Sequence, residues 1–221
     1  MKEKELAAAD AATAEEPAAV AENVTETEAL TEADKKAAKK AKVKQYFSAK
    51  KIATMAVMAA LAFVISIFDF PLFPQASFLK LDFGNVFILL TGFLFGPIEG
   101  VIVCGIKEVI RISMSTTGGV GELANFLMAT AYIIIPATVY KFRRRFWVVI
   151  PSLIAGVAAM TAMALVCNRY ITFPLFMGKG AEGAFKSLWP FIIYFNLAKG
   201  AIISVLVCLM YKTLSKLLKM F

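Results

Sequence analysis

The chain has 221 residues, of which 59% are hydrophobic, and a formal net charge of +8. Ordinary soluble domains are roughly 45–50% apolar, so this composition favours an all-α integral membrane protein. Histidine is absent, and the three cysteines lie far apart within apolar stretches, which argues against histidine-based catalysis and predicts no metal site. We therefore expect no enzyme, and because the basic residues cluster beside apolar segments, no binding of nucleic acid.

Residues 1–45 are rich in Ala, Glu and Lys, and we expect them to form a disordered cytoplasmic tail. The first 34 residues hold 10 acidic and 2 basic side chains. A segment of this composition cannot build a hydrophobic core of its own. The membrane domain is expected to occupy residues 46–221.

Six apolar segments follow the tail, and they predict a bundle of six transmembrane helices. The segments are Ile52–Phe68, Gly84–Phe95, Ile98–Met114, Gly121–Tyr140, Phe146–Cys167 and Leu188–Tyr211. A perpendicular crossing needs about 20 residues. The second segment is shorter than that, so it is expected to be a short helix that leans on its neighbours.

The basic residues predict the orientation of this bundle. Eight lysines lie between Lys35 and Lys51, the run "KFRRR" lies between the fourth and fifth segments, and three more lysines follow the sixth. These three places fall on one side of the membrane if all six segments cross it. Because basic loops stay on the cytoplasmic side, both termini are predicted to be cytoplasmic.

Amide and charged side chains lie near the predicted outer ends of the last three segments. They are Glu122, Asn125, Asn168, Asn196 and Lys199. A lysine inside a membrane costs roughly 2.5–3.5 kcal/mol on insertion scales, so such residues need compensating partners. One interpretation is a ligand site that opens to the outside. The other is that these residues bond only to one another, for example through an ion pair between Glu122 and Lys199.

Three further charged residues lie on the third segment. Lys107 and Arg111 are four residues apart and share a helix face, whereas Glu108 lies on a different face. We expect a structural or surface role for Glu108 and Arg111.

The loop after the first segment, "FDFPLFPQASFLKLDF", contains two prolines and five phenylalanines. Proline restricts the backbone and the aromatic rings can cover apolar surface. The loop is interpreted either as a lid over the ligand site, with Phe78 and Leu79 as candidate contacts, or as an aromatic belt at the membrane interface.

Small residues line the first segment. Ala56 and Ala60 are spaced so that another helix can approach closely. They are candidates for binding a partner subunit, and the alternative is packing against helices of the same chain.

Taken in order, "FPQASFLKLDF", "GFLFGPIEGVIV", "GELANF", "NRYITFP" and "NLAKG" resemble the riboflavin-specific S components of energy-coupling factor (ECF) vitamin transporters. The resemblance covers residues 46–221. It implies six helices that bind one vitamin at the outer side, and a first loop that closes over it. It also implies a first helix that meets a transmembrane coupling (T) subunit, and two cytoplasmic ATPase (A) subunits that drive transport. Riboflavin would then be a transported ligand, and no cofactor is expected.

The resemblance also assigns candidate ligand contacts. The side chains that it matches to flavin contacts are Asn168, Asn196 and Lys199, with Glu122 and Asn125 as further candidates.

The chain departs from the riboflavin type at two places. It reads "LDFGN" where riboflavin members usually read close to "LDFSD", and Lys107-Glu108 where they usually have Lys-Asn. An FMN-like flavin, pantothenate or folate is therefore an alternative ligand, and a stand-alone secondary carrier is an alternative class.

Overall fold

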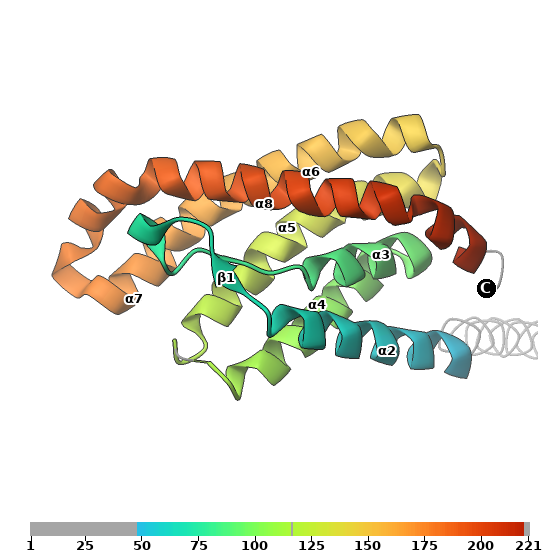
Figure 1. Ribbon diagram of the computed structural model, residues 1–221, viewed down its shortest axis with the longest axis horizontal. Coiled ribbons are helices and arrows are strands. Elements are labelled where there is room, and N and C mark those ends of the chain that lie inside the picture. Colours follow the sequence, from blue (N-terminus) through green and yellow to red (C-terminus); the bar gives the residue numbers. More distant parts are fainter. Residues whose placement is uncertain (1–47, 116, 219–221) are drawn as a thin grey trace, which may run out of the picture. The chain divides into compact units, whose positions relative to one another are not determined.

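The computed structural model describes residues 48–115 and 117–218, and this part of the chain is mostly helical (Figure 1). The helices from Lys51 onward belong to one compact unit. The predicted tail, residues 1–45, lies outside the described residues.

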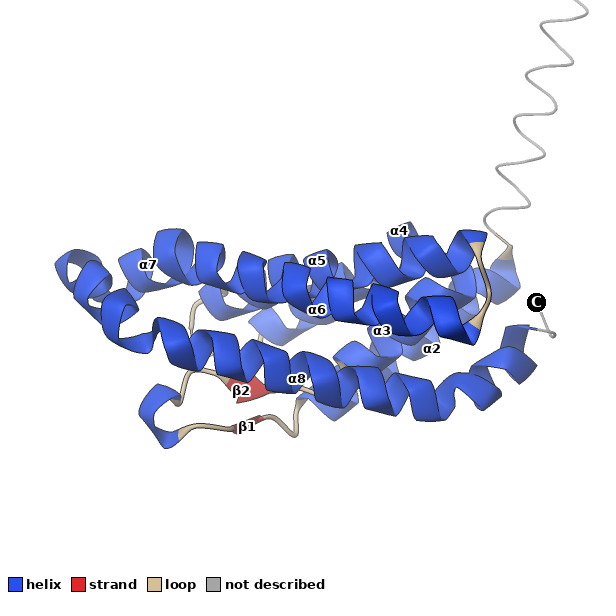
Figure 2. Cartoon of the chain, turned by 90° about the horizontal axis from the view of Figure 1, so that it is seen from above, coloured by secondary structure: helices blue, strands red, loops and turns tan. Residues whose placement is uncertain are grey.

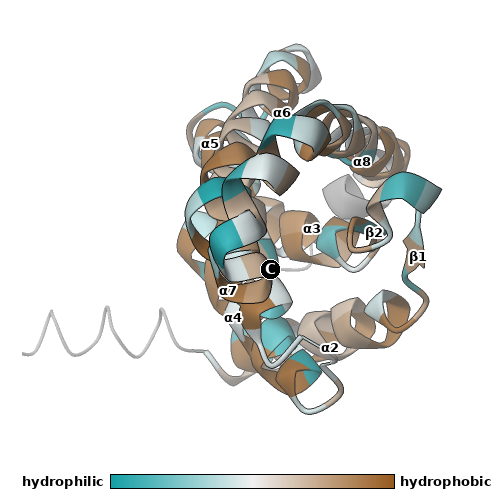
Figure 3. Ribbon diagram, turned by 90° about the vertical axis from the view of Figure 1, so that its left-hand side faces the viewer, coloured by the Kyte–Doolittle hydropathy of each residue, from teal (hydrophilic) through white to brown (hydrophobic). Residues whose placement is uncertain are grey.

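Within the described residues, six helices of eleven or more residues match the six predicted segments. They are α2 (Ala49–Ser66), α3 (Asn85–Phe95), α4 (Pro97–Ile112), α5 (Val120–Phe142), α6 (Phe146–Cys167) and α8 (Ala181–Leu218). By length and composition, three stretches suit a membrane crossing, namely Ala49–Ser66, Val120–Phe142 and Trp147–Met210, the last of which contains most of α6 and of α8. The helical ribbons are largely apolar in Figure 3, as expected for a protein of the membrane. Six crossings remain a prediction.

Two connections contain structure of their own. Between α2 and α3, β1 (Phe70–Pro71) pairs antiparallel with β2 (Lys80–Leu81), and the one-turn helix η1 (Pro74–Ala76) lies between them (Figure 2). Between α6 and α8 the chain forms a π-helical turn η2 (Asn168–Thr172), the short helix α7 (Phe173–Met177) and a 3₁₀ turn η3 (Gly178–Gly180). We name residues 67–84 the first loop.

The helix α8 is longer than its apolar segment predicted. It begins at Ala181, seven residues before the start of the predicted segment at Leu188. Glu182 and Lys186 form an exposed ion pair of 2.9 Å one turn apart, which favours helix over loop in this polar stretch.

The connections alternate between the two ends of the bundle. In Figure 1 the start of α2, the connection from α5 to α6 and the end of α8 all lie toward the right-hand end, while the first loop and α7 lie toward the left. Basic residues therefore gather at one end, as the charge pattern predicted. We call the opposite end, with the first loop and α7, the loop end.

The short helix α3 is surrounded by protein, which explains how an 11-residue helix persists in this fold. Nine of its 11 residues are buried, so it presents almost no face to lipid. Its turn into α4 requires Gly96, which has a φ of 129°, a value that side chains rarely adopt. Pro97 then occupies the first turn of α4, where a missing N–H costs nothing.

Small residues set the helix crossings. A methyl group on Gly100 of α4 would lie 3.1 Å from the Cα atom of Gly92 in α3. A methyl group on Gly156 of α6 would lie 2.7 Å from the carbonyl oxygen of Tyr132 in α5. Backbones that approach this closely gain packing contacts that hold helices together in lipid.

The crossing at Gly156 provides a test of the packing. Gly156→Ala should destabilise the protein by about 1–3 kcal/mol, because the added methyl meets backbone that cannot easily move. Gly105→Ala is the matched control, since the added carbon would lie 3.5 Å from Phe126, an ordinary contact. Thermal unfolding in detergent should show a lower melting temperature for Gly156→Ala alone. Equal melting temperatures would contradict the assignment of a tight crossing.

Candidate functional site

A buried cluster of charges lies toward the loop end. The Lys107 side chain is 0% exposed and lies between two carboxylates, with its Nζ atom 2.6 Å from Asp82 Oδ2 and 2.7 Å from Glu108 Oε1. Asp82 also accepts a hydrogen bond of 2.7 Å from the Gly84 amide. A lysine buried in a membrane protein needs such partners, because an unpaired charge there is expensive.

The charge cluster continues across the bundle through an amide. Asn125 of α5 donates from Nδ2 to Glu108, and its Oδ1 accepts a hydrogen bond of 3.0 Å from Lys199 Nζ of α8. Two carboxylates and two ammonium groups thus balance in charge. We call Asp82, Lys107, Glu108, Asn125 and Lys199 the ionic chain.

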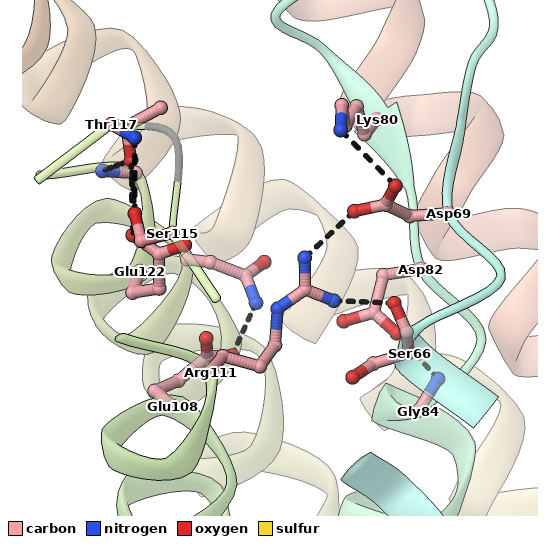
Figure 4. Close-up of polar contacts among 12 residues, drawn as sticks. Ser66, Asp69, Lys80, Asp82, Gly84, Glu108, Arg111, Ser115, Thr117 and Glu122 are labelled. Atoms are coloured by element: carbon pink, nitrogen blue, oxygen red, sulfur yellow. Dashed lines mark hydrogen bonds and ion pairs between the residues drawn. The ribbon is translucent and has the colours of Figure 1, made fainter. Parts of the chain in front are cut away.

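The face of α4 that carries Lys107 also binds the beginning of the first loop. Arg111, one turn after Lys107, bonds Asp69 at 2.7 Å and donates to the carbonyl oxygen of Ser66 (Figure 4). Asp69 also pairs with Lys80 at 3.2 Å, which ties the two sides of the loop together. Arg111 therefore holds the first end of the loop, through Asp69. Lys107 holds the second end, through Asp82.

Two predicted site residues present unused acceptors. Asn168 and Asn196 are both buried, and each donates from Nδ2 to a carbonyl oxygen of its own helical turn at 2.8 Å, Ala164 and Ile192 respectively. Within residues 48–115 and 117–218, no hydrogen bond reaches either amide oxygen. Asn168 begins the π-helical turn, a feature that often occurs at functional sites.

Glu122 lies apart from the ionic chain. Its Oε2 accepts hydrogen bonds from Ser115 at 2.7 Å and from Thr117 at 3.0 Å, so it stabilises the turn that precedes α5 (Figure 4). The alternative of an ion pair between Glu122 and Lys199 is wrong, because Lys199 bonds Asn125 instead. The sequence could not reveal this, because Ser115 and Thr117 lie in a loop without periodicity.

Of the two roles expected for Glu108, structural or surface, the structure supports the structural one, because its side chain is buried and bonds Asn125. Glu108 and Lys107 are adjacent residues and were assigned to different faces, yet their charged ends meet at 2.7 Å. Long side chains can reach across a helix surface in this way. The structural role expected for Arg111 is confirmed by its bonds to the first loop.

The first loop contacts the α7 region through aromatic rings. The ring of Phe78 lies 5.5 Å from that of Phe173, and Phe73 lies 6.0 Å from Phe191 of α8. Leu79 is buried in an apolar cluster that also contains Phe173, whereas Phe78 is 41% exposed. The loop therefore packs on α7 and α8, five residues along the chain from Asn168 and from Asn196, and its role as a lid stays a prediction.

The candidate partner residues of α2 face outward. Ala56 and Ala60 are exposed, whereas Ala59 and Ala62 are buried against the rest of the bundle. The alternative that Ala56 and Ala60 pack inside this chain is therefore not supported, and their face is open to another helix.

Apolar helices with polar side chains buried near the loop end form an internal polar site in a membrane protein. The chain belongs to the substrate-specific components of ECF transporters, whose family profile, "ECF transporter, substrate-specific component", matches residues 50–211. It is thus a transporter component, not an enzyme, and a multi-pass protein of the bacterial plasma membrane. This confirms the family indicated by the sequence.

Comparison with individual relatives shows which members of this family the chain resembles. The chain is 31% identical over 175 residues to the riboflavin transporter RibU of Staphylococcus aureus (strain TCH60), covering 77% of this chain and 93% of that protein. It is 30% identical over 171 residues to the riboflavin transporter FmnP of Bacillus subtilis (strain 168), covering 73% and 90%. A solved structure of the S component of a bacterial ECF transporter aligns with a TM-score of 0.68 and 32% identity, covering 77% of this chain and 98% of that chain.

The burial of Lys107 between two carboxylates predicts that its removal strongly destabilises the protein. Lys107→Met leaves Asp82 and Glu108 buried without their cation and should cost about 3–5 kcal/mol. Lys80→Met removes the ion pair of a side chain that is 48% exposed, and should cost no more than about 1 kcal/mol. Melting temperatures without ligand should separate the two variants clearly. A Lys107→Met protein as stable as Lys80→Met would show that the charge cluster is not needed for folding.

Proposed function

We propose that the chain is the high-affinity riboflavin-binding subunit of an ECF-type vitamin uptake transporter. The observation that carries the proposal is the pair of buried amides, Asn168 and Asn196, with unbonded oxygens on the helices that the first loop covers. Lys199, one turn after Asn196, adds a cation whose only described hydrogen bond is to Asn125. The names of the relatives support riboflavin as the ligand.

The chemistry of these side chains suits a flavin. Riboflavin is a planar tricycle with an imide and carbonyl groups at one end and a ribityl chain at the other. Asn168 and Asn196 offer acceptors for the imide N–H and, after rotation of the amide, donors for its carbonyl groups. Lys199 donates to a carbonyl or ribityl oxygen. Asn125 and Glu122 are further candidate contacts, and of the two Asn125 is favoured because it bonds Lys199.

The first loop is proposed to close over the bound flavin. Phe78 and Leu79 would cover the ring, since aromatic and aliphatic side chains pack well on flat π-systems. The bonds from Arg111 and Lys107 hold both ends of the loop, so movement is expected between them, in residues 70–81.

Uptake against a gradient needs partners that supply energy. We propose that the exposed face with Ala56 and Ala60 binds a transmembrane coupling (T) subunit, and that two cytoplasmic ATPase (A) subunits drive transport. In this arrangement the six helices cross the bilayer, both termini are cytoplasmic, and the loop end faces outward.

Ligand contact is tested by removing the proposed donors and acceptors. Asn196→Ala and Lys199→Met should each weaken riboflavin binding about 5–150-fold, because a polar group of the ligand loses its partner at a cost of about 1–3 kcal/mol. Lys186→Met is the control, because that side chain is 74% exposed in the first turns of α8. Titration against intrinsic fluorescence measures the affinity. Unchanged affinity together with a lowered melting temperature would mean that the two residues are only structural.

Coupling to the partner subunit is tested on α2. Ala56→Trp combined with Ala60→Trp should abolish riboflavin uptake by the assembled transporter, because bulk prevents close helix approach, while the isolated protein still binds riboflavin. Leu61→Trp is the control, since Leu61 is also exposed but points about 140° around the helix from Ala56 and about 100° from Ala60. If binding and uptake fall together, the alanine face is needed for the fold of this chain instead.

A further inference from the structure

Asn85 is a buried amide that no described part of the protein satisfies. Its side chain is at the first position of α3 and the residue is only 1% exposed. Neither its nitrogen nor its oxygen has a hydrogen-bond partner within residues 48–115 and 117–218. An amide carries two donors and one acceptor, and leaving them unpaired away from water is unfavourable. Some other group should therefore complete this site.

The helix crossing places Asn85 beside the ionic chain. Gly92 of α3 touches Gly100 of α4, and the two helices run in opposite directions from Gly96. Asn85 lies seven residues before Gly92, and Lys107 lies seven residues after Gly100. Seven residues are about two turns, so both side chains lie about 10 Å from the crossing, on the same side of it and on the facing surfaces.

The position of Asp82 agrees with this placement. Asp82 is three residues before Asn85 and bonds Lys107 directly at 2.6 Å. Asn85 thus lies on the face of α3 toward α4, three residues from the carboxylate that bonds Lys107.

The polar groups nearby are bonded to one another rather than to Asn85. Lys107 bonds Asp82 and Glu108, and Asn125 bonds Glu108 and Lys199. Since this chain of contacts balances its charges without Asn85, the amide is not required to hold it together. Its donors and its acceptor make no hydrogen bond to any described residue.

We propose that Asn85 is a further ligand-binding residue, which bonds a group of the flavin that both donates and accepts hydrogen bonds. Two parts of riboflavin have this chemistry, the ribityl hydroxyls and the imide edge of the ring. The inference rests on the proposed function. It adds α3 to a site that otherwise comprises the first loop, α5, η2 and α8.

The test uses the full-length protein in detergent and Asn85→Leu, which keeps the volume but removes the polar atoms. Without ligand, the melting temperature should rise, because an unpaired buried amide is replaced by an apolar group of similar shape. Affinity for riboflavin should fall about 5–150-fold. Thr130→Val is the matched control, because the Thr130 hydroxyl is also buried without a partner in the described residues. Thr130 lies on α5, about 140° around the helix from Asn125, so the Thr130→Val protein should bind riboflavin with unchanged affinity.

Two analogues identify the contacted group. Lumiflavin lacks the ribityl hydroxyls, and 3-methylriboflavin lacks the imide N–H. The loss caused by Asn85→Leu should disappear for the analogue that lacks the contacted group. An equal loss for all three flavins would mean a general distortion and would overturn the inference, as would unchanged affinity for riboflavin. Unchanged affinity with a lowered melting temperature would mean that an internal water satisfies Asn85.

A failure of the inference about Asn85 can be distinguished from a failure of the proposed function. If Asn196→Ala and Lys199→Met weaken riboflavin binding but Asn85→Leu does not, only the inference about Asn85 fails. If the unmodified protein does not bind riboflavin, the proposed function fails and the inference fails with it.

Discussion

Burial of Lys107 is the constraint on which the loop end of this protein depends. A lysine that is 0% exposed must be paired, and its partners here come from two places, Asp82 at the second end of the first loop and Glu108 on α4 itself. Glu108 bonds Asn125, which in turn bonds Lys199. One buried cation thereby links the first loop, α4, α5 and α8. Because breaking a buried pair costs far more than breaking an exposed one, these elements should keep their relative positions while residues further along the loop move.

This arrangement suits a subunit that must bind a substrate and later release it. The walls of the bundle are apolar, and the helices cross closely at small residues such as Gly92, Gly100 and Gly156. The polar groups that a ligand would need are held by bonds that balance their charge before the ligand arrives. Such preorganisation reduces the ordering cost of binding. The unbonded oxygens of Asn168 and Asn196 and the unpaired amide of Asn85 are the places where a ligand would complete the hydrogen bonding.

The helices were predictable from the sequence, and their polar contacts were only partly so. Apolar runs bounded by Gly, Pro and basic residues indicated α2 to α6 closely, and the Asn196 and Lys199 pair was evident as polar residues inside an apolar segment. The role of Lys107 was missed because it depends on Asp82, 25 residues away, and on the crossing of Gly92 with Gly100. The one available signal was that Lys107 and Arg111 share a face while two aspartates bracket the first loop. The burial of Asn85 left no periodic signal, because nearly every residue of α3 is buried.

The most direct measurement is a structure of the protein saturated with riboflavin. We expect the flavin at the loop end, beneath the first loop, with polar atoms within hydrogen-bond distance of Asn196 and Lys199 and with the bond between Lys107 and Asp82 intact. A flavin bound elsewhere, or a protein that forms no complex at saturating riboflavin, would contradict this expectation.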